Sequence, residues 1–402
     1  MKSSALIFLL AGVSIFLCSC GSTQQIVQRN TQKKLRAIFI QNFQLADTQL
    51  QFLMQQLPAG KFPKTYHPTT GTYEFSGSDW WCSGFYPGSL LYTFQQTGDS
   101  SLLNEAKRML LLLEKEQYNT STHDLGFMMY GSFGNALKIA PQESYKKILI
   151  QSARSLCKRF DPTVGCIKSW DSKKNDFLVI IDNMMNLELL FWATRETGDS
   201  VFYKTAIAHA NTTMKNHFRS DFSSYHVINY DANNGTVLQK KTAQGYADNS
   251  AWARGQAWGL YGFTVMYRET KDRIYLEQAR RIANYLLQHP NRTADGVPYW
   301  DYNAPNIPNA LRDASAGAVM ASAYLELMDY VDPKEAATMK NAAIQILNTL
   351  STPTYLAPTK TIGGFILQHS VGHIPQKTEV DVPLTYADYY FLEAMQRYLS
   401  LK

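Results

Sequence analysis

Residues 186–210 read NLELLFWATRETGDSVFYKTAIAHA, an apolar segment followed by a turn and a more polar segment. In the second segment, apolar residues recur three and four positions apart, which predicts an amphipathic helix. The turn contains Gly198, which can end a helix in the left-handed conformation, and Asp199, which can cap the start of the next helix. This stretch therefore predicts a helical hairpin with a buried first helix and an outer second helix.

The same pattern recurs along the chain. Two more segments carry it, each with its own turn: 88–108 with Thr97-Gly98-Asp99, and 259–283 with Thr270-Lys271-Asp272. We expect two further helical pairs with different turns at about 124–159 and 312–347, and a last helix after Tyr386. Repeated pairs with apolar first helices close into a ring of inner helices wrapped by outer helices. We therefore predict an all-α fold, an (α/α)6 barrel forming a single domain over residues 36–402, with an open solenoid as the alternative.

The N-terminal segment has the features of a bacterial export signal. It contains Lys2, an apolar run over 5–17 and the residues Leu-Cys-Ser immediately before Cys20. This ending resembles the lipoprotein cleavage box, so we expect removal of residues 1–19, a lipid on Cys20 and a tether over 20–35. A plain signal peptide cleaved nearby is the alternative. No later stretch is apolar for the roughly 18 residues that a membrane helix needs, so we expect a cell-envelope lipoprotein, periplasmic or at the surface, held to the membrane only by its lipid anchor.

Composition excludes several classes of function. Lys and Arg exceed Asp and Glu by 39 to 33, which suits a small anionic ligand, but there is no basic stripe of the kind that binds nucleic acid. After Cys20 the cysteines are Cys82, Cys157 and Cys166, without C-x-x-C spacing, so we expect neither a structural zinc site nor a disulfide scaffold. The chain has 24 Tyr and 7 Trp, which suit a sugar-stacking cleft and equally a large helical core.

Residues capable of chemistry gather where the inner helices are expected to begin. Asp124 and Asp182 lie one repeat apart and would face each other across the mouth of the ring. Between them we expect one guanidinium, three indoles and two imidazoles: Arg254, Trp81, Trp252, Trp258, His123 and His226. The apolar neighbours of Asp182 would raise its pKa and suit it to acid catalysis. The structural alternatives are that both aspartates cap helices, that Arg254 pairs with a structural aspartate such as Asp248, and that the indoles belong to the core.

Seven segments together carry a family resemblance. They are WCSGFYPGSL at 81–90, HDLGFMMYGSFGNA at 123–136, VIIDNMMNLELL at 179–190, QGYADNSAWARGQAWGLYGF at 244–263, PYWDY at 298–302, RDASAGA at 312–318 and EVDVPLTYADYYFLEAM at 379–395. The chain resembles the unsaturated glucuronyl hydrolases, glycoside hydrolase family 88, over essentially the whole body that follows the signal peptide. The resemblance implies an (α/α)6-barrel enzyme that removes a Δ4,5-unsaturated uronic acid from lyase-generated oligosaccharides by hydrating the vinyl ether, without a metal or organic cofactor.

The resemblance also implies roles for particular residues. Asp182 would act as general acid and base, and Asp124 would assist it by holding the sugar. Residues expected to bind substrate are His226, Gln244, Trp252, Arg254, Trp258 and His123, with Trp81, Phe85 and Trp170 as hydrophobic walls. Lys377, in the loop over 368–381, would meet a sulfate on the neighbouring sugar or would simply be solvated.

The substrate expected first is a glycosaminoglycan disaccharide, sulfated and derived from heparin or chondroitin. One rival is the related unsaturated rhamnogalacturonyl hydrolase family, which shares the barrel and the hydration chemistry but acts on pectin fragments. The other is a lipoprotein that only binds oligosaccharides, which would keep the stacking indoles but would not need Asp182 in an apolar segment beside a second carboxylate.

Overall fold

The computed structural model describes residues 32–171 and 176–401, and the predictions for the signal peptide, Cys20 and most of the tether lie outside these ranges. The chain divides into two compact units, Met1–Asn42 and Phe43–Lys402. In the first unit the described residues, 32–42, are helical. The second unit contains the named helices and strands, and the following description concerns that unit. The domain boundary at residue 36 stays a prediction.

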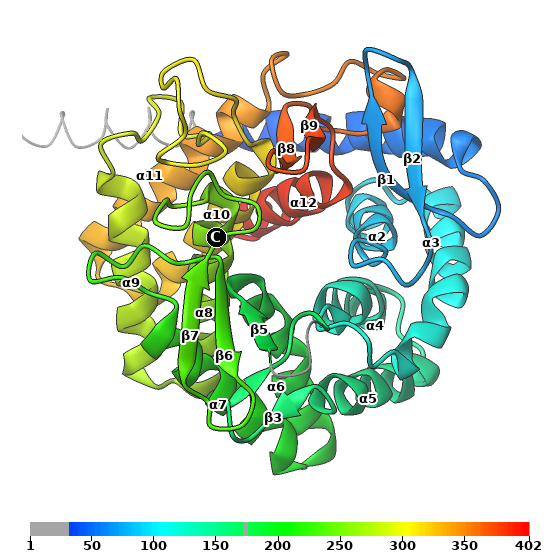
Figure 1. The fold of residues 1–402 in the computed structure, drawn as a ribbon. Helices are drawn as coiled ribbons and strands as arrows, with labels where there is room; N and C mark the ends of the chain where they lie inside the picture. Colours follow the sequence, from blue (N-terminus) through cyan, green and yellow to red (C-terminus); the bar gives the residue numbers. More distant parts are fainter. Residues whose placement is uncertain (1–31, 172–175, 402) are drawn as a thin grey trace, which may run out of the picture. The chain divides into compact units, whose positions relative to one another are not determined.

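The helices of Phe43–Lys402 alternate between an inner and an outer ring (Figure 1). The inner ring consists of α2 (Phe85–Thr97), the π-helix η2 (Gly126–Gly134) with α4 (Asn135–Ile139), α6 (Leu187–Thr197), α8 (Ala253–Thr270), α10 (Ala314–Leu327) and α12 (Thr385–Ser400). The outer ring contains α3 (Ser100–Leu113), α5 (Glu143–Cys157), α7 (Ser200–Asn216), α9 (Arg273–Gln288) and α11 (Pro333–Leu350). Contacts run from α8 to α10, from α10 to α12 and from α12 back to α2, which closes the ring. The predicted (α/α)6 barrel is confirmed.

The turns between paired helices form as their sequences predict. Asp99 accepts a hydrogen bond from Ser101 N at 2.7 Å, and the corresponding distances are 2.9 Å for Asp199 with Val201 N and 3.1 Å for Asp272 with Ile274 N. The residue before each aspartate is left-handed, with φ of 76° at Gly98, 73° at Gly198 and 57° at Lys271. Local capping thus specifies these hairpins, and the lysine shows that the third turn tolerates a side chain in this conformation.

The inner helices are buried on nearly every side, as their apolar composition predicts. Every residue of α10 is buried, and in α8 burial is continuous from Ala253 to Met266. Small residues permit this close packing. At Gly262, for example, a Cβ would overlap the side chain and backbone of Met184. The outer helix α9, in contrast, buries residues spaced three and four apart, as an amphipathic helix does.

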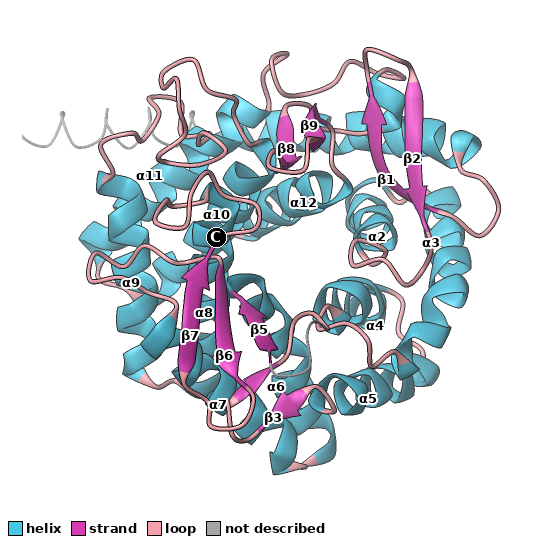
Figure 2. Cartoon of the chain, viewed as in Figure 1, coloured by secondary structure: helices cyan, strands magenta, loops and turns pink. Residues whose placement is uncertain are grey.

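Four small antiparallel sheets precede inner helices and were not predicted (Figure 2). They pair β1 (Phe62–His67) with β2 (Thr72–Ser76), β3 (Phe160–Asp161) with β4 (Cys166–Ile167), β5 (Asp176–Ile180) with β6 (Val227–Asp231) and β7 (Val237–Lys241), and β8 (Ser370–His373) with β9 (Thr378–Val382). The apolar run before Asp182 is therefore a strand. Val179 packs in one apolar cluster, while Leu178 and Ile180 pack in another, because successive strand residues face opposite sides.

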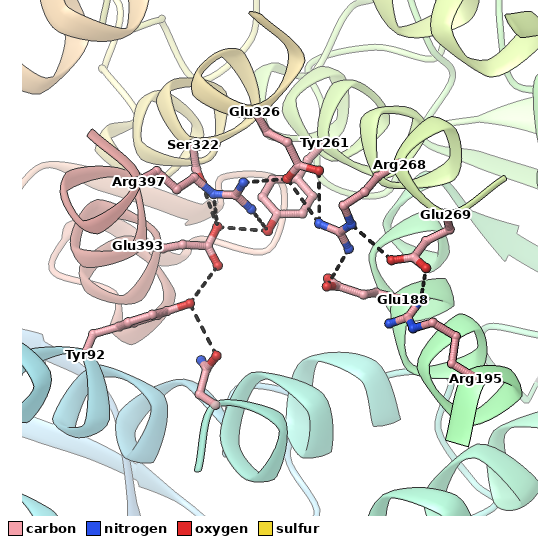
Figure 3. Close-up of polar contacts among 11 residues, drawn as sticks. Tyr92, Glu188, Arg195, Tyr261, Arg268, Glu269, Ser322, Glu326, Glu393 and Arg397 are labelled. Atoms are coloured by element: carbon pink, nitrogen blue, oxygen red, sulfur yellow. Dashed lines mark hydrogen bonds and ion pairs between the residues drawn. The ribbon is translucent and has the colours of Figure 1, made fainter. Parts of the chain in front are cut away.

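A charged network joins four inner helices, through the C-terminal parts of α8, α10 and α12 and the first turn of α6 (Figure 3). Arg268 of α8 contacts Glu188 of α6 at 2.5 Å and Glu326 of α10 at 3.0 Å. Arg397 of α12 contacts Glu326 as well, at 2.5 Å. Burial favours the neutral form of Glu326, but the two guanidinium groups outweigh it and lower the pKa of this carboxyl. The ion pairs thus connect α6, α8, α10 and α12 within the barrel.

Hydrogen bonds to Glu393 extend this network. Its carboxylate accepts from Tyr92 at 3.2 Å, Tyr261 at 2.8 Å and Ser322 at 2.6 Å (Figure 3). Tyr92 lies on α2, so this carboxylate connects three inner helices to α12.

Two observations bear on the sequence predictions for membranes and thiols. In residues 32–171 and 176–401, no helix combines the length and the apolar character required to cross a bilayer. Cys82, Cys157 and Cys166 are free thiols, and Cys82 and Cys166 are buried.

Candidate active site

A cavity of about 510 Å³ lies where the inner helices begin, at the end of the barrel that we call the mouth. It is lined by Lys64, Trp80, Trp81, His123, Asp124, Trp170, Ile180, Asp182, Ala243, Gln244, Arg254, His373, Gln376, Thr378, Glu379 and Tyr386. Seven of the predicted site residues are therefore brought together on its wall: Asp124, Asp182, His123, Gln244, Arg254, Trp81 and Trp170. Helix starts and hairpins from both halves of the sequence meet here.

Asp182 lies in a 3-10 turn, η3 (Ile181–Asn186), directly after strand β5. The neighbouring Asn183 holds this turn, because its side chain donates to Ile167 O at 2.7 Å and accepts from Ser169 Oγ at 2.9 Å. No side chain caps η3, so the interpretation of Asp182 as a helix cap is not supported. Its Oδ1 atom is buried and has no hydrogen-bond partner among the described residues. An unsatisfied carboxylate oxygen in a cavity indicates a functional group.

The surroundings of Asp182 favour a protonated carboxyl near neutral pH. The side chain is 14% exposed. Burial raises its pKa to about 7, with Arg254 opposing the rise and Asp124 adding to it. The sequence prediction of a raised pKa agrees with this geometry. A carboxyl of this kind can deliver a proton at neutral pH and can take one back afterwards.

His226 presents a neutral N–H group to Asp182. Its Nδ1 accepts from the backbone N–H groups of Ala243 at 3.1 Å and Gln244 at 3.2 Å, so the neutral ring carries its proton on Nε2. Burial, with the positive charge of Arg254, holds the pKa of His226 well below its usual range. Nε2 lies 3.8 Å from Asp182 Oδ1. This gap is too long for a hydrogen bond, and it leaves a donor available to a substrate or water.

Asp124 and His123 form the second polar pair of the cavity. Asp124 Oδ2 accepts from Thr122 Oγ1 at 2.8 Å, and no side chain caps the helix that follows, so the helix-cap interpretation fails here too. His123 donates from Nδ1 to Ser169 O at 3.0 Å, and its Nε2 lies 3.1 Å from Asp124 Oδ1. Burial lowers the pKa of His123, although the Asp124 carboxylate opposes this shift, and Nε2 faces Asp124 without a hydrogen bond.

Arg254, near the start of α8, is a fixed cation. Its guanidinium donates to Asp313 Oδ2 at 2.9 Å, Val371 O at 2.5 Å and Gly372 O at 2.9 Å. Arg254 thus pairs with a structural aspartate, but that residue is Asp313, since Asp248 instead accepts from the backbone of Thr242 at 2.8 Å. Although Arg254 is 1% exposed, it lines the cavity. A charge held in this way needs no rearrangement when an anion binds.

The remaining aromatic predictions lie behind the cavity wall. Trp258 and Trp252 are buried, and the Trp252 ring packs 4.4 Å from His226 and 4.6 Å from the Arg254 guanidinium, so they support cavity groups instead of forming its surface. Phe85 packs 5.7 Å from Trp81 and lines a different cavity, deeper in the barrel.

The cavity wall also differs from the sequence prediction at Lys377 and at several residues that were not predicted. Lys377 is exposed in the β8–β9 turn and is not part of the cavity wall, whereas its neighbours Gln376 and Thr378 are. Residues that line the cavity but were not predicted include Lys64, Trp80, Glu379 and Tyr386. Lys64 and Glu379 belong to hairpins, and no local pattern indicates that β1 and β9 come together. Tyr386 lies within the segment of the resemblance at 379–395, which was its only signal in the sequence.

Comparisons with known proteins decide the family. The model of Glycosyl Hydrolase Family 88 matches residues 56–269. The chain belongs to glycoside hydrolase family 88. An "Unsaturated glucuronyl hydrolase" from Formosa agariphila is 46% identical over 346 residues, which is 85% of this chain and 86% of the relative. An "Unsaturated chondroitin disaccharide hydrolase" from Streptococcus pneumoniae is 31% identical over 342 residues, covering 82% and 86% of the two chains.

Solved structures support the same assignment. The crystal structure of an "unsaturated glucuronyl hydrolase specific for heparin" matches with a TM-score of 0.87 and 46% identity, covering 90% of this chain and 97% of that one. The crystal structure of an "Unsaturated Glucuronyl Hydrolase" from Bacillus sp. GL1 matches with a TM-score of 0.82 and 30% identity, covering 88% of this chain and 96% of that one. The predicted family, fold and enzyme class, an unsaturated glucuronyl hydrolase, are thus confirmed. The roles of individual residues stay predictions.

Proposed function

We propose that this enzyme removes the Δ4,5-unsaturated uronic acid from the non-reducing end of lyase-generated oligosaccharides, with glycosaminoglycan disaccharides as the first expected substrates. The observation that carries the proposal is the Asp182 carboxyl. It lines the cavity with a pKa of about 7, and its unpartnered Oδ1 lies 3.8 Å from the neutral His226 N–H. This combination suits a single group that first gives and then takes a proton.

The reaction is hydration of a vinyl ether. Asp182 gives its proton to C4 of the unsaturated ring, which leaves positive charge at C5 and on the ring oxygen. Water then adds at C5 and passes a proton to the Asp182 carboxylate. The resulting hemiketal opens and releases the neighbouring sugar, so that no nucleophile attacks the anomeric carbon. Because Asp182 begins and ends protonated, a pKa near the working pH serves both steps.

The other groups of the cavity position the sugar. The uronate carboxylate would lie near the Arg254 guanidinium, whose charge Asp313 and two carbonyl oxygens hold in place. Asp124, with His123, would accept hydrogen bonds from ring hydroxyls. Trp81 and Trp170 line the cavity and offer flat apolar surfaces on which sugar rings can pack.

The experiment measures the ultraviolet absorbance of the conjugated uronate in lyase-made disaccharides. The wild type should abolish this absorbance as water adds across the double bond, and Asp182→Asn, which has no proton to give, should not. Mass spectrometry should find the free aglycone. If the wild type leaves every glycosaminoglycan fragment intact but consumes a pectin fragment, the rhamnogalacturonyl alternative replaces this proposal. If sugars bind without any loss of absorbance, the protein is a binder.

We propose also, from the sequence alone, that the protein is a lipoprotein of the bacterial cell envelope anchored through Cys20. The Leu-Cys-Ser-Cys ending supports this proposal. In a bacterial host, the wild type should incorporate labelled fatty acid and sediment with membranes, and Cys20→Ala should do neither. Labelling that persists in the variant would contradict the anchor.

A further inference from the structure

Two hairpins build a charged wall on the active-site cavity. Lys64 of β1 and Glu379 of β9 both line the cavity, and Lys64 Nζ lies 3.3 Å from Glu379 Oε1. Lys64 also contacts Glu74 of β2 at 3.0 Å, but Glu74 does not line the cavity. Lys64 lies 5.3 Å from the ring centre of Trp80, an indole that is 43% exposed. The pair therefore lies toward the open side of the cavity.

The Glu379 carboxylate is held in place against this cavity. Its side chain is 13% exposed, and its φ of 54° is a left-handed conformation that side chains seldom adopt. Such a conformation persists when its surroundings enforce it. Gly372 leaves room for the carboxylate, because a Cβ at this position would overlap Glu379 Oε2. The carbonyl of Gly372 accepts from Arg254 Nη2 at 2.9 Å and from Gln244 Nε2 at 3.0 Å, which ties the hairpin to the cavity.

The charges of this wall do not cancel. Lys64 is one cation shared between the carboxylates of Glu74 and Glu379. Burial disfavours its charge, but the two carboxylates outweigh this effect and raise its pKa. The lysine therefore stays protonated, and the three groups leave a surplus of negative charge that Glu379 presents to the cavity. His67 contacts Glu74 from its other side, at 2.6 Å, and lies outside the cavity wall.

We propose that Glu379 selects the aglycone by charge, disfavouring an anionic neighbouring sugar and accepting a neutral or amino sugar, with Lys64 setting the strength of this selection. The inference rests on the proposed function and deepens it. Like charges repel more strongly beside partly buried groups than in bulk water, and Glu379 is the carboxylate that the β8–β9 hairpin places on the cavity wall. Lys377, expected from the sequence to meet a sulfate, lies in the same hairpin but off the cavity wall.

The experiment compares kcat/KM for a sulfated unsaturated disaccharide with kcat/KM for its unsulfated counterpart. Glu379→Gln keeps the shape of the side chain and removes its charge, so the ratio of sulfated to unsulfated kcat/KM should rise about tenfold. Lys64→Met leaves Glu379 uncompensated and should lower the same ratio. Changes in opposite directions distinguish charge selection from simple damage to the wall, which would move both variants together.

Glu74→Gln is the graded control, because it removes the other carboxylate of Lys64 from outside the cavity and leaves Lys64 to neutralise Glu379, so its ratio should rise by less than that of Glu379→Gln. An unchanged ratio in Glu379→Gln, or an equal rise in Glu74→Gln, overturns the proposal. A loss of sulfated activity in Lys377→Met with no change in Glu379→Gln overturns it in favour of sulfate capture by the lysine. These outcomes all require an active wild type. A wild type that hydrates no disaccharide overturns the proposed function and, with it, this inference.

Discussion

The barrel holds two cavities, one at its mouth and one deeper among the inner helices, and the two differ in how far their polar groups are paired. The deeper cavity, of about 440 Å³, is lined by Arg268, Arg397, Glu326 and Glu393, whose charges are matched in the network of Figure 3. The mouth cavity is of similar volume, but there Asp182 Oδ1 is buried with no partner among the described residues. The polar groups of the deeper cavity thus hold helices together, whereas the mouth cavity contains a carboxyl that is available to donate a proton.

The contrast shows which feature marks the functional site. Neither volume nor the number of charges separates the two cavities, since both hold several ionisable side chains. The separating feature is a carboxyl with a raised pKa and a buried oxygen that has no hydrogen-bond partner among the described residues, which is Asp182 in the mouth cavity. Asp388 shows that both conditions are needed. Burial raises its pKa to about 7 as well, but its two oxygens accept from Ile366 N at 3.0 Å and Leu367 N at 2.8 Å. A raised pKa alone is therefore not the mark of catalysis.

Among the variants that test this difference between the two cavities, Asp182→Asn should have the largest effect. The amide cannot give a proton, so kcat should fall by about 10²–10⁴-fold, the usual contribution of general acid–base catalysis. Steady-state kinetics on an unsaturated disaccharide measures the loss. Thermal melting should show a folded protein. Activity within a few fold of the wild type would remove Asp182 from the mechanism and with it the functional distinction between the two cavities.

In the deeper cavity, Glu326→Ala should act on stability instead of chemistry. It leaves Arg268 and Arg397 without a shared carboxylate in a largely buried site, which should cost about 3 kcal/mol of unfolding free energy. Denaturant unfolding measures the cost. The matched control is Glu277→Ala, which removes a half-exposed carboxylate that pairs with Arg281 at 2.6 Å and should cost less than about 1 kcal/mol. Equal costs in the two variants would contradict a structural role for the network.

Asp388→Asn tests whether the second carboxyl with a raised pKa is structural. Its carboxyl group accepts two backbone N–H groups, and an amide can accept only through its oxygen, so one N–H would face an NH2 group. The free energy of unfolding should fall by about 1–3 kcal/mol. The pH at which kcat/KM falls should stay where it is in the wild type. A shift of that pH in Asp388→Asn would mean that Asp182 is not the group that titrates.

The pH profile gives the smallest of these effects. Asp182 must begin protonated, so kcat/KM should fall as the pH rises through about 7, by about tenfold per pH unit beyond it.

The free energy of unfolding also depends on pH through the ionisation of Asp182. The pKa of Asp182 is about 7 in the folded protein, whereas an aspartate in the unfolded chain has its ordinary pKa of 3.8, so stability is lost as the pH rises between these values. Asp182→Asn should therefore melt higher than the wild type at pH 8, with a smaller difference at pH 5. A variant that melts lower at pH 8 would contradict the raised pKa.

The sequence by itself determined the paired helices, the barrel and the residues at the centre of the site. Helical period, left-handed residues such as Gly198 and caps such as Asp199 act within a few positions of one another, so these hairpins can be predicted locally. The family segments brought Asp124, Asp182 and Arg254 into one prediction. No strand was predicted for the apolar run before Asp182, although its β-branched residues were a signal for the strand that forms there.

Only the tertiary structure decided which groups stay free. Arg254 pairs with Asp313, 59 residues away, instead of the nearby Asp248. Lys64 meets Glu379 because strand β1 packs beside β9. Asp182 Oδ1 has no hydrogen-bond partner among the described residues, whereas the side chain of the neighbouring Asn183 donates to Ile167 O, 16 residues away. Helices follow from interactions between neighbours in the chain. The pairing of charges depends on contacts between residues that are distant in sequence, which no local pattern records.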